Sequence, residues 1–179
     1  MAIRLFDGEE EDNMSFWRLY YHLTWSTKNR EPFITPEMEP RLFAYMVKKS
    51  AELEAFVYAI NGWNDHVHIV AAIPPKVAVA ELVKLIKGSS THYLNFDVRL
   101  DYHFEWQRGY GALSVGERQR PIAETYVRNQ KEHHSKNTTN AWLERYSDLD
   151  EGPDKPTSDT AHMIREEQAI YQISAEIPF

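Results

Sequence analysis

The sequence predicts an α+β fold of the split β-α-β type, in which two helices back an antiparallel sheet. Two kinds of pattern predict it. Aromatic, apolar and β-branched residues are concentrated in four segments, as in strands, and apolar residues recur every three or four positions in three others, as in helices. The segments follow the order β-α-β-β-α-β-α, and 179 residues are enough to bury one core.

The first strand and the first helix have recognisable starts. Residues 16–27 are rich in aromatic and β-branched side chains, which favour strands. After a polar turn, Thr35 and Pro36 are typical of a helix start, as the N-cap and the first helical residue. Apolar residues at roughly helical spacing then predict a helix that ends near residue 55.

A pair of strands and a second helix come next. Residues 56–63 and 66–73 predict two strands, joined by a tight turn at Asn64-Asp65. Two prolines end the second of these strands, and an apolar stripe over residues 77–95 then predicts the second helix. The two strands and the helix continue the alternation that a split β-α-β fold requires.

The last elements are a fourth strand and a third helix. Residues 104–115 predict the strand, although Gly109 and Gly111 interrupt it. A third helix is expected over residues 121–136, beginning at a proline. The first six elements therefore match a ferredoxin-like arrangement, and the third helix is an addition to it.

Charge divides the chain into three parts. The net charge is −7, but residues 14–140 hold 16 bases against 13 acids, whereas both ends are strongly acidic. We therefore expect a flexible acidic N-terminal extension at residues 1–13, a folded domain at residues 14–140 and an acidic C-terminal extension of unknown role at residues 141–179. The mildly basic middle permits a nucleic-acid partner without requiring one.

Several classes of protein are excluded or disfavoured. No apolar run approaches the ~20 residues that span a bilayer, so no membrane partner is expected. The N-terminus shows no basic segment followed by an apolar one, which disfavours a secretory signal. The absence of cysteine excludes disulfides and thiolate metal sites and fits a reducing, cytoplasmic location.

Two histidines share one face of a predicted strand. In a strand, His66 and His68 project to the same side, close enough to bind one metal ion, while Val67 and Ile69 point to the opposite side. The turn at Asn64-Asp65 places the histidines at the start of the strand, where solvent and substrate can reach them. The alternative is a pair of half-buried core histidines, because short motifs often occur by chance.

Tyr126 and Gln130 are four residues apart in the predicted third helix, so they share a face. The amide oxygen of Gln130 would be costly to bury without a partner, and a metal held by the histidines would provide one. Such an oxygen is acceptable to Mg²⁺ or Mn²⁺. The alternative for Tyr126 is a place at the edge of the core with its hydroxyl in water.

These motifs resemble those of one family. His66-Val67-His68 matches the histidine–hydrophobic–histidine motif of the HUH endonuclease superfamily. The segment Tyr126-Val127-Arg128-Asn129-Gln130 resembles the tyrosine helix of its single-tyrosine transposases, the insertion-sequence-200-like and REP-associated enzymes. Four further segments are similar, at residues 21–28, 64–68, 85–90 and 106–111. The likeness covers about residues 16–137 in the expected order, which makes residues 14–140 the expected catalytic domain.

The resemblance implies metal-dependent cleavage and rejoining of single-stranded DNA at hairpins. Tyr126 would be the nucleophile that forms a 5′-phosphotyrosine and releases a 3′-hydroxyl. His66, His68 and Gln130 would be the ligands of Mg²⁺ or Mn²⁺. Members of the family typically act as homodimers, and in several the tyrosine helix of one subunit completes the histidine pair of the other. The linker at residues 116–120 would permit such an exchange, and a self-contained site is the alternative.

Basic side chains are candidates for contacts with DNA phosphates. They are Lys28, Arg30, Lys84, Lys87, Arg108 and Arg128. For each of them the alternative is ordinary solvated surface. Trp63, Trp106 and Tyr110 are candidates for stacking on unpaired bases, although aromatic residues of a sheet more often pack in the core. His133 and His134 are expected at the surface, near the end of the third helix.

Three alternatives remain open on the sequence alone. A host-adopted protein of the same fold would bind DNA hairpins without cleaving them. An unrelated metal-dependent hydrolase would use His66 and His68 with a nearby acid such as Asp65, and its activity would survive the replacement of Tyr126. A structural ferredoxin-like domain with no site would show no change in stability on addition of metal. The order of the elements and the spacing of the motifs favour the tyrosine transposase over all three.

Overall fold

The computed structural model describes residues 16–145. They lie within the unit of residues 1–149. The predicted N-terminal extension and all but residues 141–145 of the predicted C-terminal extension lie outside the described residues. No helix among the described residues is long and apolar enough to cross a membrane.

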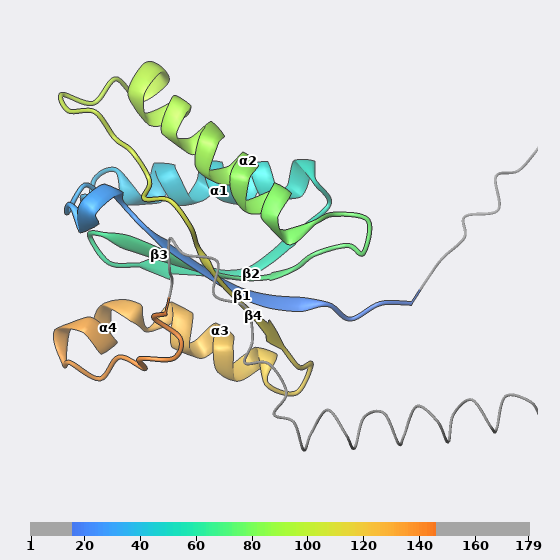
Figure 1. Ribbon diagram of the computed structural model, residues 1–179. Coiled ribbons are helices and arrows are strands. Elements are labelled where there is room, and N and C mark those ends of the chain that lie inside the picture. The colour runs from blue at the N-terminus through green and yellow to red at the C-terminus, as the bar shows by residue number, and fades with distance from the viewer. Residues whose placement is uncertain (1–15, 146–179) are drawn as a thin grey trace, which may run out of the picture. The chain divides into compact units, whose positions relative to one another are not determined.

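The strands form one antiparallel sheet in the order β2-β3-β1-β4 (Figure 1). They span Tyr20–Ser26 (β1), Phe56–Gly62 (β2), His66–Ala72 (β3) and Gly111–Val115 (β4). This order is that of a ferredoxin-like fold, with β1 and β3 at the centre of the sheet. The predicted fold class is confirmed.

Two long helices pack on one face of the sheet, α1 at Glu39–Glu52 and α2 at Val79–His92 (Figure 1). Alternate residues of the central strands face these helices and bury their apolar side chains against them. The core on this face includes Leu23, Trp25, Leu42, Met46, Val67, Ile69, Leu82 and Ile86. Burial of so many large side chains is the main stabilising contribution to the fold.

The opposite face of the sheet is covered by α3 at Arg120–Arg128 and α4 at Gln130–Ser135 (Figure 1). Strand alternation directs His66, His68 and Val70 of β3 to this face. Val70 packs there against Val127 of α3. With both faces covered, every residue of β3 is buried, which explains why the strand is apolar apart from its two histidines.

Several predicted boundaries differ from those observed, among them the start of the first helix, which is Glu39 instead of Pro36, so that Thr35 is not its N-cap. The fourth strand pairs regularly only over Gly111–Val115, because the chain turns at Gly109, whose φ is 74°. The second helix is followed by a π-helical segment, Tyr93–Val98. The predicted third helix is two helices, α3 and α4, because Asn129 leaves helical geometry with φ −95° and ψ 14°.

A close backbone approach fixes the hairpin that precedes His66. A Cβ atom on Gly62 would lie 2.1 Å from the carbonyl oxygen of His66 and 2.9 Å from the Cα of Val67. The N–H of Trp63 donates to that same His66 oxygen at 3.0 Å. Only glycine fits here, so Gly62 sets where β3 begins and how His66 is presented.

Replacing Gly62 by alanine should therefore destabilise the protein, by about 1–3 kcal/mol in the free energy of unfolding, because the added methyl group meets backbone atoms. Gly88 is the matched control, since a Cβ there meets nothing within 4 Å and the residue lies inside α2. Gly88→Ala should stabilise by up to about 1 kcal/mol. Urea unfolding measures both, and an unchanged midpoint for Gly62→Ala would contradict the close approach.

Candidate active site

Each of the paired histidines is held through its Nδ1 atom. The Nδ1 of His66 lies 2.5 Å from a carboxylate oxygen of Asp65, and the Nδ1 of His68 lies 2.9 Å from the Nε2 of His22 on β1. His66 is 1% exposed and His68 is fully buried. Hydrogen bonds of this kind orient metal-binding imidazoles by leaving the other nitrogen free to coordinate. The two Nε2 atoms are thus presented to the space under α4.

Those two Nε2 atoms converge on one carboxylate oxygen. The Oε2 of Glu144 lies 3.0 Å from the Nε2 of His68 and 3.4 Å from that of His66. A third imidazole joins them, because the Nε2 of His134 lies 3.1 Å from that of His66. Glu144 belongs to a short turn at residues 141–144, whose fold over the histidines buries them.

Tyr126 and Gln130 meet the other oxygen of the same carboxylate. The hydroxyl of Tyr126 donates to the Oε1 of Glu144 at 2.5 Å, and the Nε2 of Gln130 donates to it at 3.2 Å. The break at Asn129 places the two residues on different helices, yet both still face the histidine pair. The four residues expected to form the site therefore come together within one chain.

The spacing of these groups fits a divalent metal ion. Ligands ~2.1 Å from an octahedral ion lie roughly 3.0 Å apart along each edge. The Nε2 atoms of His68 and His66 lie 3.0 and 3.4 Å from the Oε2 of Glu144, close to that separation, and the Nε2 of His134 lies 3.9 Å from it. His66, His134 and Glu144 offer ligand atoms that all lie within 4.8 Å of one another. The buried Oε1 of Gln130 has no hydrogen-bond partner among residues 16–145, as expected of an oxygen reserved for a cation.

Electrostatics keep the carboxylate charged and the phenol neutral. Burial alone would raise the pKa of Glu144, but its bonds to His68 and Tyr126 and the nearby imidazoles hold that pKa well below its usual range. Burial, together with the hydrogen bond to Glu144, raises the pKa of Tyr126. Burial also lowers the pKa of His68, and that of His22 to about 3, which favours the neutral form that a metal-binding imidazole needs.

Three residues of this cluster were not expected from the sequence. His134, placed at the surface by its position in the predicted helix, instead lies against His66 with its ring stacked on Trp63. Its spacing of four residues from Gln130 was the available signal. His22 lies on the face of β1 that is directed toward the site, as the alternation of side chains along a strand predicts. The sequence around Glu144 does not predict its role, because it does not differ in kind from the sequence around the other acids of the C-terminal segment.

The access expected for the histidines is also different. Their position at the start of β3 predicted contact with solvent, but Glu144 and His134 cover them. Anything that reaches the imidazole Nε2 atoms from outside must therefore move this cover. Tyr126, by contrast, is only partly buried, and its ring stacks on that of His133 with centroids 4.7 Å apart.

The six basic candidates for DNA contacts lie in different places. Arg30 is the one that reaches the site, because its Nε lies 3.2 Å from the second carboxylate oxygen of Asp65. Arg128 donates to the carbonyl of Tyr58 and pairs with Glu124 beside α3. Of the six candidates, therefore, Arg30 contacts the residue that precedes β3, and Arg128 links α3 to β2.

The other four lie away from the histidines. Lys84 and Arg108 are exposed, and Lys28 lies 3.7 Å from Glu105. The ammonium of Lys87 donates to the carbonyls of Gln107 and Gly109, and burial lowers its pKa to about 8. Lys87 thus anchors the loop before β4.

The three aromatic candidates for base stacking also lie in different places. Trp106 is buried in the core, where its indole N–H donates to Ser90, and Tyr110 packs against that core. Trp63 is the one of the three that lies at the site, through its stacking on His134.

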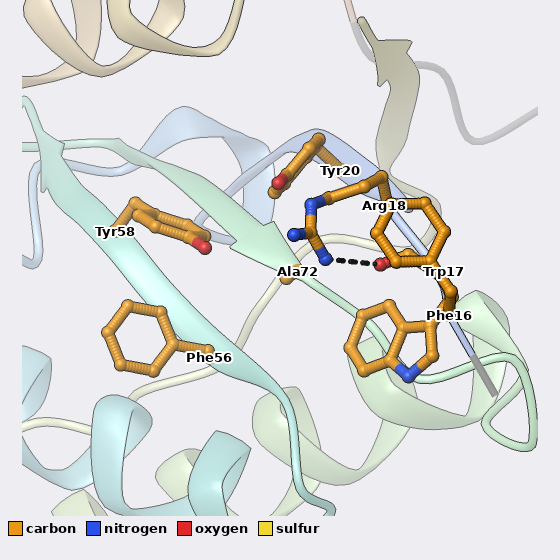
Figure 2. A pocket seen from close by; sticks show the side chains of 7 residues that line it. All are labelled: Phe16, Trp17, Arg18, Tyr20, Phe56, Tyr58 and Ala72. Atoms are coloured by element: carbon orange, nitrogen blue, oxygen red, sulfur yellow. Dashed lines mark hydrogen bonds between the residues drawn. The ribbon is translucent and has the colours of Figure 1, made fainter. Parts of the chain in front are cut away.

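A pocket of aromatic side chains lies at the far end of the same sheet face (Figure 2). Its volume is about 370 Å³, and Ala72 of β3 lies in it, four residues along the strand from His68. Four residues of strand correspond to roughly 13 Å. The pocket is lined by Phe16, Trp17, Arg18, Tyr20, Phe56, Tyr58 and Ala72.

Guanidinium groups lie over the rings of this pocket. Arg18 lies 4.6 Å from the ring centroid of Phe16, and Arg120 lies 4.2 Å from that of Tyr58. Phe16 and Phe56 remain 82% and 61% exposed, so the aromatic surface is open to a ligand. Aromatic faces beside arginines are the usual platform for unpaired bases.

The comparisons with known proteins identify the family. A family model described as IS200-like transposase matches residues 15–130, from the residue before the first described one to Gln130. The chain belongs to the IS200-like transposase family. His22, the two motif histidines and Tyr126 all lie inside the matched range, whereas His134 and Glu144 lie beyond it.

Individual relatives support the same family. The ISDra2 transposase TnpA of Deinococcus radiodurans is 27% identical over 119 residues, which cover 64% of this chain and 85% of that protein. The transposase for insertion sequence element IS200 of Salmonella typhimurium is 26% identical over 121 residues, 65% of this chain and 79% of that protein. Both relatives are transposases of the insertion-sequence type that the family model describes.

Two solved structures share the fold. One is that of a putative transposase from Deinococcus radiodurans, with a TM-score of 0.51, 25% identity, and coverage of 65% of this chain and 93% of that one. The other is a REP-associated tyrosine transposase bound to a REP hairpin, with a TM-score of 0.52. It is 16% identical and covers 68% of this chain and 74% of that one, and its likeness concerns the fold.

The hydrogen bond between His22 and His68 gives a first prediction for the site. His22→Leu should weaken binding of Mn²⁺ by about 10- to 100-fold, because the Nδ1 of His68 loses the partner that directs its Nε2 to the ion. His22→Gln, whose amide can still accept from that nitrogen, should bind within a few-fold of the wild type. Titration of free Mn²⁺ by electron paramagnetic resonance measures both, and wild-type affinity in His22→Leu would refute the role.

Proposed function

We propose that this transposase cleaves and rejoins single-stranded DNA beside a hairpin, with Tyr126 as its nucleophile and a divalent ion as its cofactor. The observation that carries the proposal is the convergence of the Tyr126 hydroxyl, the Nε2 atoms of His66 and His68 and the amide of Gln130 on one carboxylate. A phenol aimed at a cluster of metal-binding groups is the arrangement that covalent cleavage of a phosphodiester needs.

The reaction proceeds in two balanced steps. The oxygen of Tyr126 attacks a phosphorus atom, the bond from phosphorus to the 3′ oxygen breaks, and the strand leaves with a 3′-hydroxyl. The phenol loses its proton and the departing oxygen gains one. A 3′-hydroxyl then attacks the 5′-phosphotyrosine, which restores the phosphodiester and frees Tyr126. The covalent step conserves the energy of the bond, so no nucleoside triphosphate is consumed.

A cation is required because a tyrosine with a pKa near ~10 is a poor nucleophile at neutral pH. His66, His68 and Gln130 would hold Mg²⁺ or Mn²⁺, which supplies polarisation of the phosphate and stabilises charge on the leaving oxygen. The protein itself orients the groups. Asp65 and His22 hold the imidazoles, and the ring of His133 stacks on Tyr126 to fix the direction of the phenol.

The DNA partner is proposed from surface chemistry and from the hairpin-bound neighbour. The aromatic pocket lined by Phe56 and Tyr58 would stack a base of the single-stranded DNA that flanks the hairpin. Lys28, Arg30, Lys84, Lys87, Arg108 and Arg128 remain proposed phosphate contacts. A homodimer and a cytoplasmic location also remain proposals, and a site assembled within one chain does not need the second copy to be complete.

Tyr126→Phe should abolish formation of a covalent protein–DNA adduct, because phenylalanine has no oxygen to bond to phosphorus. The assay incubates the protein with a labelled hairpin oligonucleotide that carries single-stranded flanks, in Mn²⁺, and resolves adducts on a denaturing gel. DNA affinity should stay within a few-fold of the wild type. Cleavage that persists in this variant would indicate a metal-dependent hydrolase, and intact binding without any wild-type adduct would indicate a DNA-binding protein that does not cleave.

Phe56→Ala should weaken binding of the same oligonucleotide by about fivefold or more, since stacking on one base contributes about 1–3 kcal/mol. The side chain is 61% exposed, so the fold should tolerate the change. Phe96→Ala is the matched control, because Phe96 is 64% exposed and follows α2 on the opposite side of the sheet. Fluorescence anisotropy measures both affinities, and equal effects of the two variants would count against the pocket.

A further inference from the structure

Glu144 contacts every group that the proposed reaction uses. Its two carboxylate oxygens meet His66 and His68 on one side and Tyr126 and Gln130 on the other, at 2.5–3.4 Å. The residue lies beyond the range that the family model matches and beyond residue 140, the predicted end of the catalytic domain. Its position is therefore a feature of this chain's C-terminal segment that the proposed function leaves unexplained.

We propose that Glu144 is a ligand of the divalent ion in the DNA-free protein and that the scissile phosphate replaces it when DNA binds. The inference rests on the proposed function and assigns the order in which the site is filled. The carboxylate would complete the ligand set together with His66 and His68, with the Nε2 of His134 within reach as a further donor.

The geometry around Glu144 supports a cation at this position. The Nδ1 of His66 lies 2.5 Å from Asp65, so its Nε2 is the nitrogen that faces the carboxylate of Glu144, at 3.4 Å. The Nε2 of His68 faces the same oxygen at 3.0 Å. Two imidazole nitrogens and a carboxylate oxygen at such separations form a ligand set for a divalent ion.

The carboxylate also occupies the place of the substrate. For attack, the phosphorus must come within about 3–3.5 Å of the Tyr126 oxygen, and one of its oxygens must reach the cation. Glu144 already puts one oxygen 2.5 Å from that hydroxyl and the other between the two imidazoles. Carboxylate and phosphate carry the same unit charge and cannot occupy this space together, so one must leave before the other enters.

The segment that carries Glu144 is held by contacts that can be broken locally. The N–H of Asn140 donates to the Tyr126 hydroxyl at 3.0 Å, and the carbonyl of Arg145 approaches Gly111 so closely that a Cβ there would lie 2.2 Å from it. Trp142, its largest side chain, is 60% exposed. A segment with little buried apolar surface can open without unfolding the domain.

The test uses Glu144→Gln in the full-length chain and compares it with Glu132→Gln, which makes the same charge change at an exposed pair with Lys136. Without DNA, Glu144→Gln should weaken Mn²⁺ binding by about tenfold or more, because loss of a direct ligand costs at least as much as loss of an outer partner. Glu132→Gln should bind Mn²⁺ as the wild type does. Unchanged Mn²⁺ affinity in Glu144→Gln would overturn the assignment of Glu144 as a ligand.

A second measurement tests the replacement. In a Tyr126→Phe background, which prevents cleavage, Glu144→Gln should tighten binding of the hairpin oligonucleotide in Mn²⁺ by about fivefold or more, since a competing ligand has been removed. If Mn²⁺ binding weakens but DNA binding does not tighten, Glu144 is a permanent ligand and the exchange is refuted. Both measurements are independent of cleavage, so absence of the covalent adduct would defeat the proposed nuclease without deciding this inference.

Gly111→Ala provides a variant that leaves every site residue in place. Its methyl group would meet the carbonyl of Arg145 and displace the segment that carries Glu144. It should weaken Mn²⁺ binding and tighten DNA binding in the same directions as Glu144→Gln, with thermal unfolding as the check on the fold. Effects opposite in sign to those of Glu144→Gln, in a folded protein, would contradict the exchange.

Discussion

The whole site depends on the hydrogen bonds that hold the Nδ1 atoms of His66 and His68 inside a fully covered strand. β3 lies at the centre of the sheet, with α1 and α2 on one face and α3 and α4 on the other. Because side chains alternate along β3, Val67 and Ile69 face the core under α1 and α2, and both imidazoles face α3 and α4. Asp65 and His22 then fix the rings, so that the direction of the His68 Nε2 depends on the register of β1 against β3.

The sequence was sufficient for the parts of the fold that local periodicity determines. Strand alternation at residues 66–73 and helical spacing in α1 and α2 predicted elements within a few residues of those observed. Boundaries set by tertiary contacts were predicted less well. The strand expected from residue 104 is regular only from Gly111, and the break at Asn129 falls within a segment whose pattern reads as one helix.

The residues of the site can be separated in the same way, into those that local periodicity predicts and those that tertiary contacts place. His66, His68, Tyr126 and Gln130 could be found because each pair has a spacing that places it on one face of its element, and a family resemblance joined the pairs. His134 continues the same helical spacing and was assigned to the surface because helix ends are usually exposed. Glu144 could not be found, because it reaches the histidines through a turn whose path depends on Tyr126 and Gly111, which are distant in sequence.

An acidic chain that acts on DNA is less paradoxical once charge is counted within the site. The phenol and the amide contribute no charge, so Glu144 is the anion that would directly face a divalent ion while DNA is absent. Exchange for a phosphodiester replaces one unit negative charge by another, whereas addition of the phosphate beside the carboxylate would bring like charges together in a poorly solvated space. The electrostatic cost of DNA entry then depends on the mobility of one short segment rather than on the net charge of the chain.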